Sequence, residues 1–170
     1  MRAALLLLLA AGSLRAEGIE LLEPDLVRQM EAMERAVERA FRSADGTKPA
    51  AVSAARAIFL PGYGAVFSVE VNLVPTANAS PFRRSYTPEE VNAVNLRKRA
   101  ALEPLRRGMR RILIAEGPSL TDLRPDLQVT LAVSLFHFPW EDRTGLPSQV
   151  VISATRGRLA PDTVLTTRYY

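Results

Sequence analysis

The clearest alternation of apolar and polar positions lies in residues 54–74, AARAIFLPGYGAVFSVEVNLV. The apolar positions of its second half share one face: Ala65, Phe67, Val69, Val71 and Leu73. A period of two is typical of a strand with one buried face. Pro61, Gly62 and Gly64 favour a chain reversal, because proline fixes φ and glycine accepts positive φ. The stretch predicts a β-hairpin whose first, less regular strand lies at a sheet edge or is covered on both sides.

A helical period marks the segment from Asp25 to about Arg42. Its apolar residues recur every three or four positions and form one stripe: Leu26, Met30, Met33, Val37, Ala40 and Phe41. Acid–base pairs spaced by four residues, Glu31 with Arg35 and Glu38 with Arg42, lie opposite the stripe and support a helix. We expect the stripe to face the core; a partner-binding role for it is the alternative.

A second helix is expected from Thr87 to about Glu116. Its first residues combine a capping threonine, a proline at the first helical position and a glutamate that closes a capping box. Its apolar stripe comprises Val91, Val94, Ala101, Leu102, Leu105, Met109, Ile112 and Leu113. Pro104 lies in the interior, so we expect the helix to be kinked or divided there.

Strand patterns return after the second helix. Residues 123–138 alternate, residues 150–156 are rich in β-branched side chains, and residues 163–170 have β propensity with no assigned pairing. The fold class is therefore expected to be α+β, with two long helices packed on one face of a mostly antiparallel sheet of four or five strands. The expected order is helix–hairpin–helix–hairpin, so the second helix crosses over the sheet.

The N-terminus predicts export. Residues 1–16 combine an early arginine, an apolar run with five consecutive leucines, and small residues after it. This pattern is typical of a secretory signal peptide, and the run is too short to span a bilayer. Cleavage after Gly12 or after Ala16 both fit in part, and an uncleaved anchor is the alternative. We expect residues 17–170 to be a single periplasmic or extracellular α+β domain without a transmembrane span.

The composition argues against several kinds of catalytic, metal-binding and cofactor-binding site. The chain has no cysteine and one histidine, which excludes thiol nucleophiles and argues against a zinc site. It also lacks a P-loop and a dinucleotide fingerprint, so no metal and no cofactor is expected. Lys+Arg total 22 against 18 Asp+Glu; residues 1–16 hold two arginines and no acid, which leaves the mature chain a net charge of +2. That balance does not predict binding to nucleic acid.

Two residues are candidates for catalysis, although we assign no catalytic residue. His137 could serve a triad, but no serine motif accompanies it, and a structural role is favoured. Glu70, on the more polar strand face, could form a carboxylate pair as in a glycosidase. The simpler expectation is that Glu70 pairs across the strands with an arginine such as Arg56.

Basic and aromatic residues form a candidate binding surface. Its members are Tyr63, Phe82, Arg83, Arg84, Arg106, Arg107, Arg110, Arg111 and Trp140. The arginines of the second helix fall mostly opposite its apolar stripe, with Lys98 nearer to the stripe. Such a face suits an acidic partner or an anionic surface. Its alternative is a solvated outer face, and the aromatic residues could instead pack back onto the fold.

These observations favour an exported, non-enzymatic binding or assembly module that contacts an envelope protein or an anionic surface. The alternative function is a cell-envelope hydrolase that uses paired carboxylates. The ligand and the oligomeric state do not follow from the residues.

Overall fold

The computed structural model describes residues 22–42, 49–75 and 86–170. The expected signal peptide at 1–16 and the candidate binding residues Phe82, Arg83 and Arg84 lie outside these ranges. The described elements are α1 (Pro24–Ala40), β1 (Ala50–Ala51), β2 (Arg56–Leu60), β3 (Gly64–Asn72), α2 (Pro88–Glu116), β4 (Gln128–Leu135), β5 (Gln149–Thr155) and β6 (Thr166–Tyr169), with short 3₁₀ turns at Gly117–Ser119 and Arg156–Arg158.

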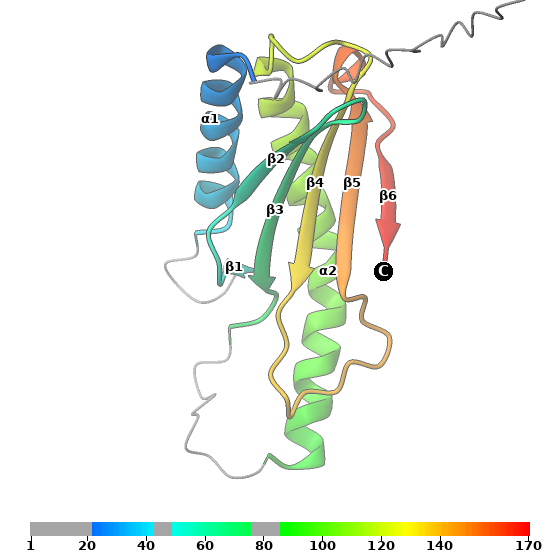
Figure 1. Cartoon of the computed structure of the whole chain (residues 1–170). Helices are drawn as coiled ribbons and strands as arrows, with labels where there is room; N and C mark the ends of the chain where they lie inside the picture. The colour runs from blue at the N-terminus through cyan, green and yellow to red at the C-terminus, as the bar shows by residue number, and fades with distance from the viewer. Residues whose placement is uncertain (1–21, 43–48, 76–85) are drawn as a thin grey trace, which may run out of the picture.

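The strands form one six-stranded mixed sheet, which confirms the α+β class (Figure 1). β1 and β2 pair with different parts of one edge of β3, β4 pairs with its other edge, and β5 and β6 follow. The pairings are antiparallel except for β3 with β4, which is parallel.

The expected strand number and element order are therefore wrong in part. β1 precedes the first hairpin and β6 follows the second, so the order is not a simple helix–hairpin repeat. The sheet is mixed because α2 carries the chain back to the end at which β3 began, and β4 must then run in the same direction as β3.

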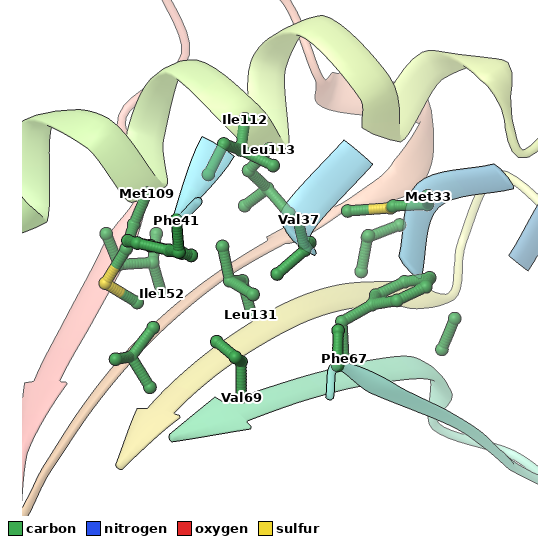
Figure 2. Close-up of a cluster of buried hydrophobic side chains, with 14 of the residues drawn as sticks. Met33, Val37, Phe41, Phe67, Val69, Met109, Ile112, Leu113, Leu131 and Ile152 are labelled. Carbon is green, nitrogen blue, oxygen red and sulfur yellow. The ribbon is translucent and has the colours of Figure 1, made fainter. Parts of the chain in front are cut away.

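Both helices pack on one face of this sheet, and the core lies between the two layers (Figure 2). The alternation expected of β3 is confirmed, because all five apolar positions between residues 65 and 73 are buried. Figure 2 shows side chains of α1, α2, β3, β4 and β5 meeting in this core, with Met33, Val37, Met109, Leu113, Leu131 and Ile152 among those that are buried.

α1 also fixes the position of β2, the edge strand of the first hairpin. Glu38 Oε1 accepts a hydrogen bond from Ala55 N at 3.1 Å, and Glu34 accepts one from Ala57 N. Glu38 is thus used by the hairpin, whereas the expected pair of Glu31 with Arg35 forms at 3.8 Å. On the stripe of α1, Ala36 is buried and Ala40 is exposed, the reverse of the expectation for Ala40.

α2 begins as its sequence predicts, because Thr87 and Glu90 form a reciprocal capping box. The helix is continuous over 29 residues, so Pro104 does not divide it. Proline deprives the carbonyl four residues earlier, that of Ala100, of its donor. Both residues are exposed, so water can satisfy that carbonyl.

The opposite face of the sheet carries no described helix, and we call it the open face. The strand register places these residues on it: Arg56, Ile58, Leu60, Val66, Ser68, Glu70, Thr130, Ala132, Ser134, Val151, Ser153, Thr166 and Arg168. Figure 1 views the molecule with the open face toward the reader, with α2 behind the strands and α1 at the left beside β2.

Gly64 is the position at which the hairpin tolerates no side chain. Its φ is +134°, and a Cβ built there would lie 2.0 Å from the backbone oxygen of Gln128 at the start of β4. We predict that Gly64→Ala lowers the free energy of unfolding by at least about 2 kcal/mol, measured by urea denaturation.

Gly108 provides the matched control, because it lies inside α2 with no atom within 4 Å of a built Cβ. Gly108→Ala should stabilise the protein by up to about 1 kcal/mol. Equal effects of the two substitutions would contradict the assigned role of Gly64.

Candidate functional site

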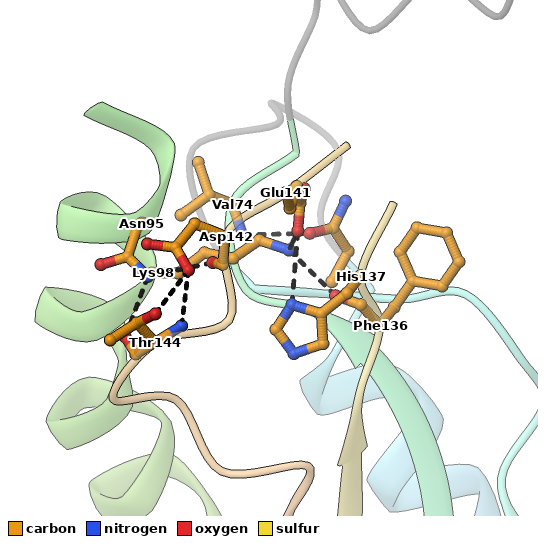
Figure 3. A network of polar contacts seen from close by, with 9 residues as sticks. Val74, Asn95, Lys98, Phe136, His137, Glu141, Asp142 and Thr144 are labelled. Atoms are coloured by element: carbon orange, nitrogen blue, oxygen red, sulfur yellow. Dashed lines mark hydrogen bonds and ion pairs between the residues drawn. The ribbon is translucent and has the colours of Figure 1, made fainter. Parts of the chain in front are cut away.

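The strongest polar cluster lies where the loop between β4 and β5, residues 136–148, packs along the N-terminal half of α2 (Figure 3). Two polar residues of α2 are buried there, Asn95 and Lys98, with 5% and 0% of their surfaces exposed. They are three positions apart, so they lie on the same side of the helix. The loop is held by these two side chains.

Lys98 makes the central contact. Its Nζ donates to the carbonyl oxygen of Phe136 at 2.9 Å and forms an ion pair with Glu141 Oε2. Each of the two paired side chains is 1% exposed. Burial lowers the pKa of Lys98 below its ordinary value, and the hydrogen bond that Lys98 donates to Glu141 opposes that effect. The pair therefore joins α2 to the loop in an environment from which water is excluded.

His137 completes the cluster. Its Nδ1 lies 3.3 Å from Glu141 Oε2, and 5% of its side chain is exposed. Burial lowers the pKa of His137, the charge of Lys98 lowers it further, and the hydrogen bond to Glu141 opposes both effects. A neutral ring facing a carboxylate must carry its proton on Nδ1, because the carboxylate only accepts. Nε2 is then a bare acceptor, and Figure 3 shows it on the side of the ring away from Glu141.

The two carboxylate oxygens of Glu141 differ in their hydrogen-bond partners. Oε2 receives both Lys98 and His137, while Oε1 is buried and has no hydrogen-bond partner among the described residues. A buried acceptor without a partner is uncommon and costly. The carboxylate is therefore held in place by its two partners on one oxygen.

Asn95 fixes the second part of the loop. Its Nδ2 donates to the carbonyl oxygens of Asp142 and Thr144, at 3.0 and 3.1 Å. Asp142 Oδ1 in turn accepts from the hydroxyl and the backbone N–H of Thr144, and these bonds lower the pKa of Asp142. The loop is thus built from local turns that α2 orients.

Aromatic rings stack beside the cluster. Trp140 stacks on Tyr86 with ring centroids 3.9 Å apart, and Phe138 lies 5.8 Å from Trp140. Phe136 meets Phe138 edge to face at 4.9 Å. Trp140 therefore packs against the fold, which is the alternative that the sequence left open for the aromatic residues.

A depression of about 280 Å³ lies between this loop and the open face, and Glu70, His137, Arg143 and Ser148 are among the residues that line it. A second depression of about 420 Å³ continues from Glu70 over the open face toward Arg56. We call the two together the Glu70 groove, because Glu70 lines both. Pockets of this size suit small ligands.

The expected arginine surface is only partly available. Arg106 binds Glu103 through two hydrogen bonds of 2.7 and 2.9 Å, and Arg107 lies 3.6 Å from the same carboxylate. Arg110 donates to the carbonyl oxygen of Pro161, whereas Arg111 is exposed. Shared use of one acid is typical of a solvated outer face.

Tyr63 lies away from the arginines. It follows the tip of the first hairpin, and its hydroxyl lies 2.8 Å from Thr130 Oγ1 on the open face. The structure therefore separates those candidate binding residues that it describes into the outer face of α2, the aromatic stack and the open face. It does not assemble them into one site.

Sequence reasoning missed the burial of Lys98 and Asn95, although Lys98 was placed near the apolar stripe of α2. Val94, Lys98 and Leu105 recur at helical spacing, which was the available signal. The expected pair of Glu70 with Arg56 is wrong: Arg56 lies opposite Ser68, and no ion pair joins it to Glu70.

Two classes of feature are missing from the part of the chain that the structure describes. No group of three or more His, Asp or Glu side chains there could hold a metal ion. Within the same ranges, no helix combines the length and apolar character needed to cross a bilayer. Comparison of the chain with family models, curated proteins and solved structures finds no match.

We predict that Lys98→Met lowers the free energy of unfolding by about 3–5 kcal/mol, because it leaves the buried carboxylate of Glu141 without its cation. Urea denaturation measures the loss. The double variant Lys98→Met with Glu141→Gln should be less destabilised, since no buried charge remains. Arg111→Met, on the exposed face of the same helix, is the control and should change little. A double variant as unstable as the single one would show that the ion pair is unimportant.

The lowered pKa of His137 predicts a pH-dependent stability. The unfolded chain binds a proton near the ordinary value of 6.5, while the folded protein binds it only at lower pH. Stability is therefore complete above that value and falls as the pH drops toward the folded-state pKa. Unfolding measured at about pH 7.5 and about pH 5.5 should show a smaller pH-dependent loss for His137→Gln than for the unmodified protein. Equal losses would contradict this assignment.

Proposed function

We propose that this protein is an exported binding or assembly module that contacts a protein partner through its open face. The observation that carries the proposal is the one-sided sheet: α1 and α2 cover one face, and no described helix covers the other (Figure 1). Antiparallel strands with one solvated face are common. The residues on the open face are therefore what distinguishes it from an ordinary solvated surface.

One corner of the open face is apolar. Ile58 lies opposite Val66 in the register, with Leu60 beside it and Tyr63 reaching over Thr130. Ile58, Leu60 and Tyr63 are 56%, 41% and 41% exposed. A cluster of large exposed side chains on a rigid sheet is the kind of patch that marks protein contact sites.

The rest of the open face is rich in small hydroxyl residues. Ser68, Ser134 and Ser153 lie across its middle, and Arg56 and Arg168 lie toward its two edges. Such a surface has neither bulky side chains nor a large net charge that would prevent a protein partner from binding. An apolar corner with a polar surround matches the usual composition of a non-obligate interface.

The arrangement favours binding over hydrolysis. Glu70 is the one carboxylate among the described residues that line the Glu70 groove, so a paired-carboxylate mechanism finds no second group there. Glu141 is buried behind His137 and bound to Lys98. No observation specifically favours the hydrolase alternative.

Export is part of the proposal and rests on residues 1–16 alone. A cysteine-free domain with a continuous apolar core suits an oxidising compartment, because it needs no disulfide to fold.

Site-specific photocrosslinking tests the surface. With a photoreactive residue at Ile58, the protein should yield a defined crosslinked species in its native envelope, and Val66→Arg in the same chain should abolish it. The same probe at Arg111, on the outer face of α2, is the matched control. A crosslink from Arg111 and none from Ile58 would move the interface to the arginines.

The arginine surface has its own test. Arg106→Glu with Arg110→Glu should leave the Ile58 crosslink unchanged if the open face is the interface. Loss of the crosslink at unchanged thermal stability would instead show that the outer face of α2 binds the partner.

A further inference from the structure

Glu70 carries a carboxylate that the fold does not use. Its backbone is fixed on both sides, because its N–H donates to Ser53 Oγ at 3.0 Å and its carbonyl accepts from Val52 N at 2.9 Å. Its side chain is half-buried and makes no hydrogen bond or ion pair with any described residue. A half-buried carboxylate on a fixed backbone is suited to accept hydrogen bonds from a cationic donor.

A second acceptor lies in the same groove. His137 lines the depression next to Glu70, and its Nδ1–H is engaged by Glu141. The tautomer set by that hydrogen bond leaves Nε2 with a lone pair. Glu70 and His137 thus provide two acceptors, which together match the several N–H donors of a protonated amine.

Guanidinium groups lie in each of the two depressions. Arg143 lines the one that contains His137, and Arg56 lines the one that extends over the open face. Both residues are exposed, and neither forms an ion pair with a described residue. Guanidinium is suited to recognising carboxylates through paired N–H donors.

Hydroxyl groups complete the lining. Ser53, Ser68 and Ser134 lie in the depression toward Arg56, and Ser148 lies in the one that contains Arg143. The Oγ of Ser53 and the Oγ of Ser134 each accept a hydrogen bond from the protein, so their protons are available to a ligand. The groove therefore offers two anionic or neutral acceptors at its centre and cationic donors on each side.

We propose that the Glu70 groove binds a small zwitterion in which a protonated amine lies between two carboxylates, as in an acidic amino acid. The amine would bind Glu70 and His137 Nε2, and the carboxylates would bind Arg143 and Arg56. This inference deepens the proposed binding function, and it gives the open face a second, small ligand beside its protein contact.

The charges of the lining residues distinguish a site for a zwitterion from a site for anions alone or for amines alone. A site for anions alone would use the two arginines and would be weakened by Glu70. A site for amines alone would use Glu70 and would be weakened by the arginines, since like charges repel. A zwitterion is the one class that uses all three groups.

Isothermal titration with four probes tests the proposal. Glutamate should bind saturably, glutarate should bind more weakly because it lacks the amine, and 4-aminobutyrate should bind more weakly because it lacks one acid. A glutamyl-glycyl-glycine peptide should also bind more weakly than free glutamate, because its first α-carboxyl group is an amide; equal or tighter binding of the peptide would overturn the proposal.

Glu70→Gln should weaken glutamate binding by about tenfold or more, and Arg143→Gln should do the same. Glu103→Gln on α2 is the matched control, since it removes an exposed carboxylate outside the groove. Urea denaturation confirms that each variant is folded. Equal binding of glutarate and glutamate, no saturable binding by any amine-bearing probe, or unchanged affinity in Glu70→Gln would overturn the proposal.

The result of the titration can be distinguished from the result of the test of the proposed function. The photocrosslink at Ile58 requires no small ligand, so it can succeed when all four probes fail. Conversely, glutamate binding that disappears in Glu70→Gln would stand even if the apolar corner contacts no protein.

Discussion

The parallel pairing of β3 with β4 is the constraint on which the rest of the structure depends. It exists because α2 spans the whole sheet and returns the chain to the starting end of β3. A helical crossover needs one face of the sheet, and α1 packs on that same face, so the opposite face stays open among the described residues. The pairing also sets Glu70 opposite Ser134, directly before the β4–β5 loop. The Glu70 groove and the open face thus both follow from the parallel pairing of β3 with β4.

A long crossover helix creates a second requirement. The N-terminal half of α2 extends past the ends of the strands, where no sheet can bury it (Figure 1). The β4–β5 loop covers that part, and a loop brings backbone carbonyls that need donors. Lys98 and Asn95 supply those donors to Phe136, Asp142 and Thr144. Polar burial at this helix end therefore follows from the length of α2, and Glu141 is present to balance the charge of Lys98.

The fold was largely predictable from local patterns, and the cluster was not. Period two in β3 and the capping box of α2 determine local structure, and both are observed as expected. The pair of Lys98 with Glu141 joins residues 43 positions apart, one of them in an irregular loop that has no period. β1 was not predicted because its two alanines carry no pattern. Its partners Asn72 and Val71 lie at the far end of β3, beyond the whole of β2 in the chain. Arg106 and Arg107 show a different limit, since a row of cations on a helix is visible in the sequence while their common partner Glu103 depends on rotamers.

The buried cluster and the groove are linked through a single ring. His137 is held by Glu141 on one side and lines the groove on the other. Because burial and the charge of Lys98 lower the pKa of His137, the ring remains an acceptor at neutral pH and does not become a third cation beside Arg143. A protonated ring at that point would repel an amine and leave Glu70 as its sole acceptor. Burial of the ring is the main cause of the lowered pKa of His137, and Lys98 adds to the effect while Glu141 opposes it, so the residues that hold the loop also influence the charge of the groove wall. Lys98, Glu141 and His137 thus join the loop to α2 and also place the His137 ring at the wall of the groove.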